Sequence, residues 1–465
     1  MDQGLSLKRE VGIIGAVSFI AGTMMGSGIF ISPQYVLLAV GSPGASLVVW
    51  ACCGLIAMLG GLCYAELGTV IPESGGEYVY MLRTAGKTMA FVFVFSFVSV
   101  MRPASATGIA LSVAEYVVAP FYSGCAPPRL VVKCAAAVAI LALALVNCLS
   151  VRLATGIQVV SMAVKVLTMA VIILGGVVML FQGHTENFEE SFDGTNVGVN
   201  AIGIAFYQGL WSYDGWNTLN YLTEELKRPE VNLPRALVIA ISLVTGLYLL
   251  VNVSYLTVMT PQELMSSTAV AVTWGNKVLG SWGWIMSLAA ALSAFGSLNG
   301  TFFSGGRVCF VAAREGHMPD ILSMAHIHRL TPSPALIFTT VISLVVLIPG
   351  DFQSIVNYFS FTAWFFYAVT LSGLIYLKIR KPELPRPYSV PIVLPILILL
   401  VAVFLVLAPI IDQPQIEYLY VALFILSGAI IYVPFIHYKL CPGLFDRVTM
   451  FLQLFLEVAP AEKNL

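Results

Sequence analysis

Residues 22–30 read Gly-Thr-Met-Met-Gly-Ser-Gly-Ile-Phe and interrupt an apolar segment that covers residues 11–39. A second apolar segment, residues 198–223, contains Gly-Leu-Trp-Ser-Tyr-Asp-Gly-Trp-Asn at residues 209–217. Glycine is common in transmembrane helices, so one glycine pair alone indicates no more than close helix packing. Gly-Ser-Gly, however, leaves two of three neighbouring positions without a side chain, and an unwound turn there leaves backbone N–H and C=O groups free to bind a ligand. We therefore expect two broken helices.

Composition places these segments in a membrane. Hydrophobic residues make up 58% of the 465 and charged residues 10%, whereas soluble chains contain about 45–50% and about 25%. This balance excludes a soluble enzyme, a secreted disulfide-rich domain and a disordered chain, and leaves no polar face to cover one very large helical core. A membrane-crossing helix needs about 20 apolar residues. Twelve candidates are present: residues 11–39, 44–71, 88–117, 130–149, 155–182, 198–223, 234–259, 279–312, 333–349, 353–379, 389–411 and 417–438.

Charges in the connecting segments indicate the orientation. Lys and Arg gather in alternate connections, and the opposite connections hold little beyond Arg129, Lys133 and Lys277. Cytoplasmic loops carry the excess of basic residues, so an even number of spans with both termini in the cytoplasm is predicted. The net charge of −1 offers no basic excess for nucleic acid, and no nucleic-acid partner is expected.

The two interruptions are about five spans apart, one at the start of each half of the chain. Interrupted spans at corresponding places in two halves mark the binding site of inverted-repeat transporters. We therefore predict an all-α polytopic membrane protein of 12 transmembrane helices, arranged as a 5+5 inverted repeat plus two C-terminal helices. The predicted units are residues 1–182, 183–380, 381–440 and a cytoplasmic tail at 441–465.

The chemistry of such a site favours an amino acid. The N-terminus of a half-helix offers free N–H groups and a positive dipole end that suit a carboxylate, and unwound carbonyls suit an ammonium group. No phosphate loop, metal-binding His pair or nucleophile elbow is present, so we expect no cofactor, no metal and no enzyme. A membrane-embedded transferase would need clustered His/Asp or paired acids, which are missing. A receptor that binds an amino acid without transporting it remains an alternative.

Several motifs resemble one known family over essentially the whole chain. Residues 22–30 are similar to its first-helix motif, residues 207–217 with Thr-Glu-Glu-Leu at 223–226 to its sixth helix, and Arg-Glu-Gly-His-Met-Pro at 314–319 to the loop after its eighth span. The family is the light-chain subunits of heteromeric amino acid transporters, in the L-type branch of the amino acid–polyamine–organocation superfamily. The resemblance is strongest to the b(0,+)-type branch, which transports cystine and cationic amino acids, or to a close paralogue.

This resemblance implies a LeuT-like fold in the plasma membrane and sodium-independent exchange of neutral and cationic L-amino acids, with cystine as a further substrate, by alternating access. Met24-Met25 replaces branched residues that are common in the family. Flexible thioethers soften a pocket, so a paralogue that prefers aromatic or neutral amino acids remains an alternative.

The resemblance also assigns residues. It implies that the amides of Gly26, Ser27 and Gly28 bind the substrate carboxylate. The carbonyls of Met24, Trp211 and Ser212 would bind the α-ammonium group. The Trp211 ring would act as the gate over the substrate, and the alternative is an ordinary core aromatic.

Two ionisable residues lie within predicted spans, where charges are costly and therefore functional candidates. By the resemblance, the position of Asp214 is small in the neutral-substrate members, which implies that Asp214 attracts a cationic substrate side chain; the alternative is an internal pair with Arg102 or a hydroxyl. Lys165 would place its ammonium where sodium-coupled relatives bind Na⁺, as a coupling or structural cation. The alternative is a snorkelling lysine, against which its depth in the span argues.

Cys125 stands alone in a predicted outer loop. An unpaired cysteine that faces an oxidising compartment suggests an intermolecular disulfide. The alternatives are a free thiol or a bridge to Cys134. In the family this cysteine tethers the light chain to a single-span glycoprotein heavy chain, which is the partner that the resemblance implies.

Overall fold

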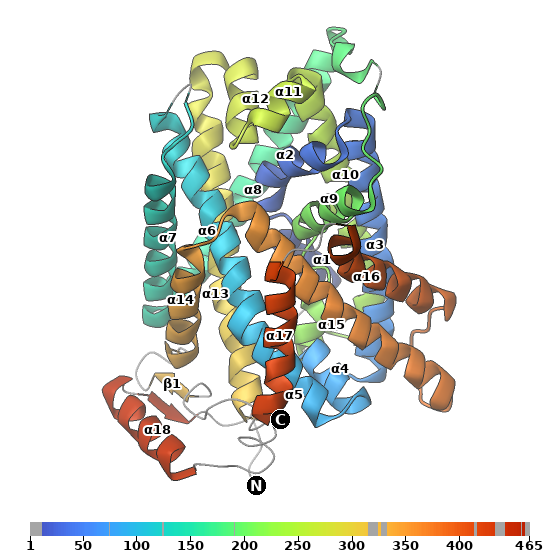
Figure 1. Ribbon diagram of the computed structural model, residues 1–465, viewed down its shortest axis with the longest axis vertical. Coiled ribbons are helices and arrows are strands. Elements are labelled where there is room, and N and C mark those ends of the chain that lie inside the picture. Colours follow the sequence, from blue (N-terminus) through green and yellow to red (C-terminus); the bar gives the residue numbers. More distant parts are fainter. Residues whose placement is uncertain are drawn as a thin grey trace.

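The computed structural model describes residues 12–460 except 74, 123–124, 190, 315–323, 327–332, 413–415, 433–441 and 457. Most of its helices run along the long axis of one bundle, with α11 and α12 at one end and α4 and α18 near the other (Figure 1). The elements in chain order, where η marks short 3-10 or π segments, are α1 (Ile13–Met24), α2 (Gly28–Val40), α3 (Pro43–Val70), α4 (Glu77–Thr84), α5 (Lys87–Ser96), η1 (Phe97–Met101), α6 (Arg102–Val118), η2 (Ala119–Phe121), α7 (Arg129–Leu149), α8 (Val151–Phe181), η3 (Glu186–Phe188), α9 (Val199–Ser212), η4 (Thr218–Glu225), α10 (Pro229–Val258), α11 (Pro261–Ser266), α12 (Val270–Val278), η5 (Gly280–Trp282), α13 (Trp284–Arg314), β1 (Met324–His326), α14 (Ser333–Leu347), α15 (Phe352–Arg380), α16 (Val393–Asp412), α17 (Ile416–Ile431), α18 (Pro442–Leu456) and β2 (Val458–Pro460).

The surface of the bundle is apolar along several helices. Large side chains that are more than half exposed recur on α7, α8 and α16; they include Val138, Leu145, Val159, Leu174 and Leu400. In the described residues, eight helices are long and apolar enough to cross a membrane, and α1 with α2 forms a ninth candidate that is bent by 49°. Apolar surface of this extent is unfavourable in water and suits lipid. The chain is therefore a multi-pass membrane protein.

The other three predicted spans coincide with shorter helices. Residues 198–223 form α9, an unwound stretch and η4, whereas 333–349 and 417–438 correspond to α14 and to α17 within its described bounds. These three α-helices have 14, 15 and 16 residues, fewer than a straight membrane-crossing helix needs. Each of the twelve predicted segments thus contains at least one helix in its described part, and the number of crossings stays a prediction.

One short β-ladder departs from the all-α prediction. β1 pairs antiparallel with β2, with Met324 opposite Pro460 and His326 opposite Val458. In Figure 1 the ladder lies beside α18, below α14. Three-residue strands carry too little alternation to be recognised in a sequence, which is why the prediction omitted them. The tail predicted at 441–465 accordingly contains a helix, α18, and one strand.

Helix packing brings the two interrupted segments together. α2 packs along α9, and α1 packs along α10. α10 also lies against α3 and α8, so it stands next to the first break and close to the second. The candidate site lies at this junction.

Candidate functional site

The first break separates α1 from α2. Met25, Gly26 and Ser27 leave the helix, and the Gly26 amide turns back to the Met24 carbonyl at 2.8 Å. In a continuous helix that amide would bond to the carbonyl of Gly22, four residues earlier. In the described part of the chain, no acceptor is recorded for the amides of Ser27 and Gly28. The start of α2 therefore presents free donors, and their use by a substrate stays a prediction.

The second break follows α9. Residues 213–217 form turns, and the Asp214 amide donates to the Trp211 carbonyl at 3.2 Å. Gly215 has φ +107°, a conformation that favours glycine. The chain resumes as the 3-10 segment η4, so the carbonyl of Ser212 has lost its helical partner.

The two breaks touch each other. A Cβ atom on Gly28 would lie 2.5 Å from Oγ and 2.7 Å from Cα of Ser212, and a Cβ atom on Gly215 would lie 2.7 Å from Cγ2 of Thr23. Only glycine permits approaches this close. The glycines that marked the interruptions in the sequence thus also bring the unwound segments into contact.

Tyr248 of α10 joins the breaks by its hydroxyl group. Its Oη lies 2.5 Å from the Met24 carbonyl and 2.7 Å from the Ser212 carbonyl. One hydroxyl proton serves one acceptor at a time, so at any moment one of the two carbonyls lacks this donor. The sequence analysis missed Tyr248. A tyrosine within a predicted apolar span was the one available signal, because a buried hydroxyl needs a partner; the sequence does not say which partner.

Lys165 of α8 is buried, 1% exposed, and its Nζ donates to the Gly22 carbonyl at 3.3 Å. This is the carbonyl that lost the Gly26 amide at the first break. The ammonium therefore remains inside the bundle and does not extend to its surface. Its proposed equivalence to a bound Na⁺ stays a prediction.

Trp211 ends α9 and lies among aromatic rings of α15. Its ring meets Phe359 edge-on at 5.1 Å and Phe352 at 6.1 Å between centroids. On the other side, a Cβ atom on Gly108 of α6 would lie 3.2 Å from the indole. The ring is thus enclosed, 6% exposed, directly beside the second break. Its role as a gate remains a prediction.

Asp214 is half-buried between Trp211 and Gly215. The positive charge of Arg102 attracts it, but in the described residues the two groups form no direct ion pair. The guanidinium lies over the Phe97 ring, 4.7 Å from its centroid, and Arg102 Nε has no hydrogen-bond partner there. The carboxylate of Asp214 is thus not saturated by this arginine.

Cys125 is exposed and unpaired, as is Cys134. Its Sγ lies 3.8 Å from the Tyr122 carbonyl. Within the described residues the two cysteines are not bridged to each other, and the intermolecular disulfide stays a prediction.

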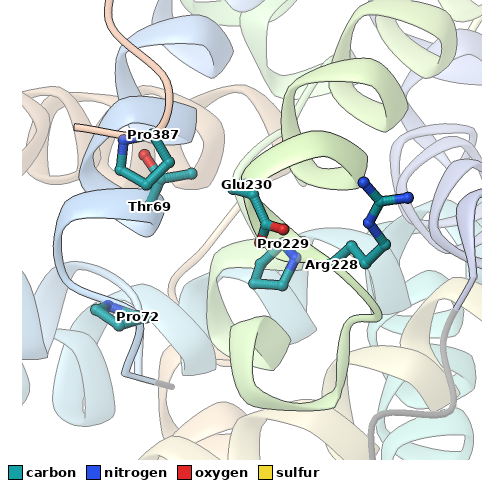
Figure 2. A pocket seen from close by; sticks show the side chains of 6 residues that line it. All are labelled: Thr69, Pro72, Arg228, Pro229, Glu230 and Pro387. Atoms are coloured by element: carbon teal, nitrogen blue, oxygen red, sulfur yellow. The ribbon is translucent and has the colours of Figure 1, made fainter. Parts of the chain in front are cut away.

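A separate charged cluster lies where α3 and α15 end. Glu66 is fully buried, and its Oε1 lies 2.9 Å from Lys378 Nζ and 3.3 Å from Arg386 Nε. These contacts are ion pairs whose angles fall outside hydrogen-bond geometry. Close by, an open pocket of about 420 Å³ lies where α3, α10 and the loop before α16 meet (Figure 2). The residues that line it are Thr69, Pro72, Arg228, Pro229, Glu230 and Pro387. This pocket contains neither break.

Two interrupted helices that meet inside an apolar bundle define a membrane transporter of the broken-helix class. The amino acid permease family model matches residues 11–435. The chain belongs to this amino acid permease family, and it is a transporter and not an enzyme. It is 52% identical to b(0,+)-type amino acid transporter 1 of Homo sapiens over 461 residues, which cover 99% of this chain and 95% of that protein. It is 42% identical to Large neutral amino acids transporter small subunit 2 of Mus musculus over 448 residues, which cover 95% and 84%.

Changing Tyr248 to Phe tests the link between the breaks. The variant removes this donor from both carbonyls. Met24 keeps the Gly26 amide at 2.8 Å, so among the described residues the Ser212 carbonyl is the one left unpaired, at a cost of about 1–3 kcal/mol for a buried group. We expect a loss of amino acid uptake and a lower thermal unfolding midpoint in detergent. Tyr255→Phe is the matched control, because Tyr255 lies two turns along α10 and makes one longer bond, 3.4 Å, to Ile29. Equal behaviour of the two variants would show that the Tyr248 hydroxyl has no special role.

Proposed function

We propose that this chain is a sodium-independent exchanger of neutral and cationic L-amino acids, with cystine as a further substrate. Contact between the two breaks carries the proposal, because it places free amides and partly satisfied carbonyls at one point inside the bundle. The proposal includes a LeuT-like fold of 12 spans, with repeat halves at residues 1–182 and 183–380, two further helices at 381–440 and a tail at 441–465. It also includes the plasma membrane, with both termini in the cytoplasm.

The substrate carboxylate would bind the amides of Ser27 and Gly28, for which the described residues provide no acceptor. The α-ammonium group would bind the carbonyls of Met24 and Ser212, which share the one proton of Tyr248. An ammonium brings three donors and supplies what that shared proton cannot. This division of roles suits a zwitterion with both charges on one carbon.

Two other predicted ligands need a local rearrangement. The Gly26 amide is bonded to Met24, and the Trp211 carbonyl accepts the amide of Asp214. Substrate would have to displace both bonds to use these groups. Because Trp211 carries both this carbonyl and the ring that would act as the gate, loss of the bond to Asp214 would couple substrate binding to closure of the ring over the substrate.

Lys165 supports the sodium-independent part of the proposal. Its ammonium group donates a hydrogen bond to the Gly22 carbonyl, which the first break leaves without its helical partner. A fixed cation at this place would brace the unwound part of the first span without an ion gradient.

The relatives' names support a partner. One relative is named a small subunit, and Cys125 is exposed and unpaired in this chain. We infer that Cys125 forms a disulfide with a single-span glycoprotein heavy chain.

Exchange is tested with the purified chain in liposomes. Vesicles preloaded with unlabelled arginine or leucine should take up labelled amino acid faster than empty vesicles, and replacing external Na⁺ by choline should leave the rate unchanged. Binding without any stimulated uptake would favour a sensor, and competition by tyrosine but not by arginine would favour the aromatic or neutral paralogue.

Asp214→Asn tests recognition of cationic side chains. A carboxylate about 4 Å from a guanidinium gains on the order of 4 kcal/mol at an effective dielectric near 20, before desolvation is subtracted. We expect arginine uptake to fall about ten-fold or more and leucine uptake to change less than about two-fold. Glu263→Gln is the control, since Glu263 lies in α11 and pairs with Lys277. An equal loss for both substrates would make Asp214 structural.

Cys125→Ser tests the covalent partner. In cells that express a heavy chain, the variant should lose the reducible high-mass band on non-reducing gels while the reconstituted chain retains exchange. Cys134→Ser, which alters the other exposed thiol of this region, should retain the band. If the band persisted in Cys125→Ser, the bridge would have to be assigned to another cysteine.

A further inference from the structure

Glu77 is a buried carboxylate that the substrate site does not use. It begins α4, is 2% exposed, and accepts hydrogen bonds on both oxygens from one side chain at the end of the second break and one side chain of η4. The amide of Asn217 donates to Oε1 and the hydroxyl of Tyr221 donates to Oε2. Burial raises the pKa of the Glu77 carboxyl, and the bonds from Tyr221 and Asn217 oppose that rise. A carboxylate is kept in such a place only with partners, so these bonds tie α4 to η4.

A second connection joins the same two elements. The Asn220 amide donates to the Tyr80 hydroxyl at 2.8 Å and to the Tyr64 carbonyl of α3 at 2.8 Å. Side chains at three positions around one turn therefore hold this segment. We call these contacts the α4 clamp, which consists of Glu77 and Tyr80 on one side and Asn217, Asn220 and Tyr221 on the other.

The residues before Glu77 are shaped for this contact. Gly76 has φ +56°, and a Cβ atom there would lie 2.6 Å from Cε1 of Tyr221. Gly75 has φ +126°. Both values lie in the region that favours glycine. The Gly-Gly pair thus lets the Tyr221 ring lie against the backbone, where its hydroxyl reaches Glu77.

The clamp acts directly on the second break. The carbonyl of Gly215 accepts from the Thr218 amide at 3.1 Å and from the Thr218 hydroxyl at 2.5 Å, so the first residue of η4 is bonded to the break. Trp216 packs against Tyr64 and Tyr367, with centroids 4.8 and 5.2 Å away. Moving η4 would therefore move the turn that carries Asp214.

The clamp lies toward one end of the bundle. Figure 1 places α4 near the end opposite α11 and α12. η4 follows the break and packs against α1, α3 and α10. η4 therefore lies beside the first break as well as directly after the second.

We propose that Glu77 is a positioning residue that holds η4 across the path from the substrate site to the α4 end of the bundle, so that release of the α4 clamp opens this path. The inference rests on the proposed function and adds the element that closes one face. Glu77 does not touch the substrate in this role. It acts through Asn217 and Tyr221.

The test compares Glu77→Ala with the wild-type chain in oriented liposomes, with KM for leucine measured separately from each face. We expect KM at the α4 face to fall by up to about ten-fold, because loss of the clamp raises the fraction of molecules open to that face, and KM at the opposite face not to fall. Tyr221→Phe keeps the ring and removes one donor, so it should shift KM in the same direction by about three-fold. It carries the test if Glu77→Ala does not fold.

A second readout does not depend on transport. Leu219 of η4 is fully buried, and a cysteine introduced as Leu219→Cys should react faster with a membrane-impermeant thiol reagent at the α4 face when Glu77→Ala is also present. Glu73→Ala is the matched control, because Glu73 is a more exposed carboxylate of the same region that pairs with Arg83 at 2.9 Å. Equal KM changes at both faces, or unchanged KM and unchanged labelling, would overturn the proposal. Absence of exchange in the wild-type chain would overturn the proposed function alone, since labelling still tests the clamp.

Discussion

Lipid cannot hydrogen-bond to a backbone, so each carbonyl that a broken helix releases inside the bundle needs a new partner. The structure provides these partners one by one. Lys165 takes the carbonyl of Gly22, Tyr248 reaches the carbonyls of Met24 and Ser212, and the amide of Asp214 returns to Trp211. The interruptions thus determine which side chains the neighbouring helices α8 and α10 must supply.

The same constraint explains why the breaks meet. An isolated interruption would have to find every partner on intact helices, whereas two interruptions in contact share one tyrosine. The contact requires bare backbone at Gly28 and Gly215, where an added Cβ would collide with Ser212 and Thr23. Because Tyr248 has one hydroxyl proton for the carbonyls of Met24 and Ser212, one of these carbonyls always has room to accept a further hydrogen bond.

Much of this arrangement is predictable from the sequence. The rest is not predictable, and the physical reason can be given for each residue. Gly-Ser-Gly at 26–28 and the carboxylate beside Gly215 mark the breaks because side-chain loss and buried charge are local features. Lys165 stands out by its depth in a span. The roles of Tyr248 and Glu77 could not be predicted, because the sequence does not say which neighbour a side chain faces. The partners of Tyr248 are 36 and 224 residues away, and those of Glu77 are 140 and 144 residues away. The hydrogen bond from the Gly26 amide to the Met24 carbonyl depends on the backbone conformation of the turn, and the residue types alone do not determine that conformation.

The ladder between β1 and β2 has a consequence for the end of the chain. Two strands of three residues are barely stable by themselves, and Pro460 has no N–H to donate opposite Met324. The pairing therefore depends on its neighbours, since α14 packs against β1 and α18 packs against β2. Any protein that captures residues 458–460 as a strand competes for the same main-chain groups that Met324–His326 now occupies.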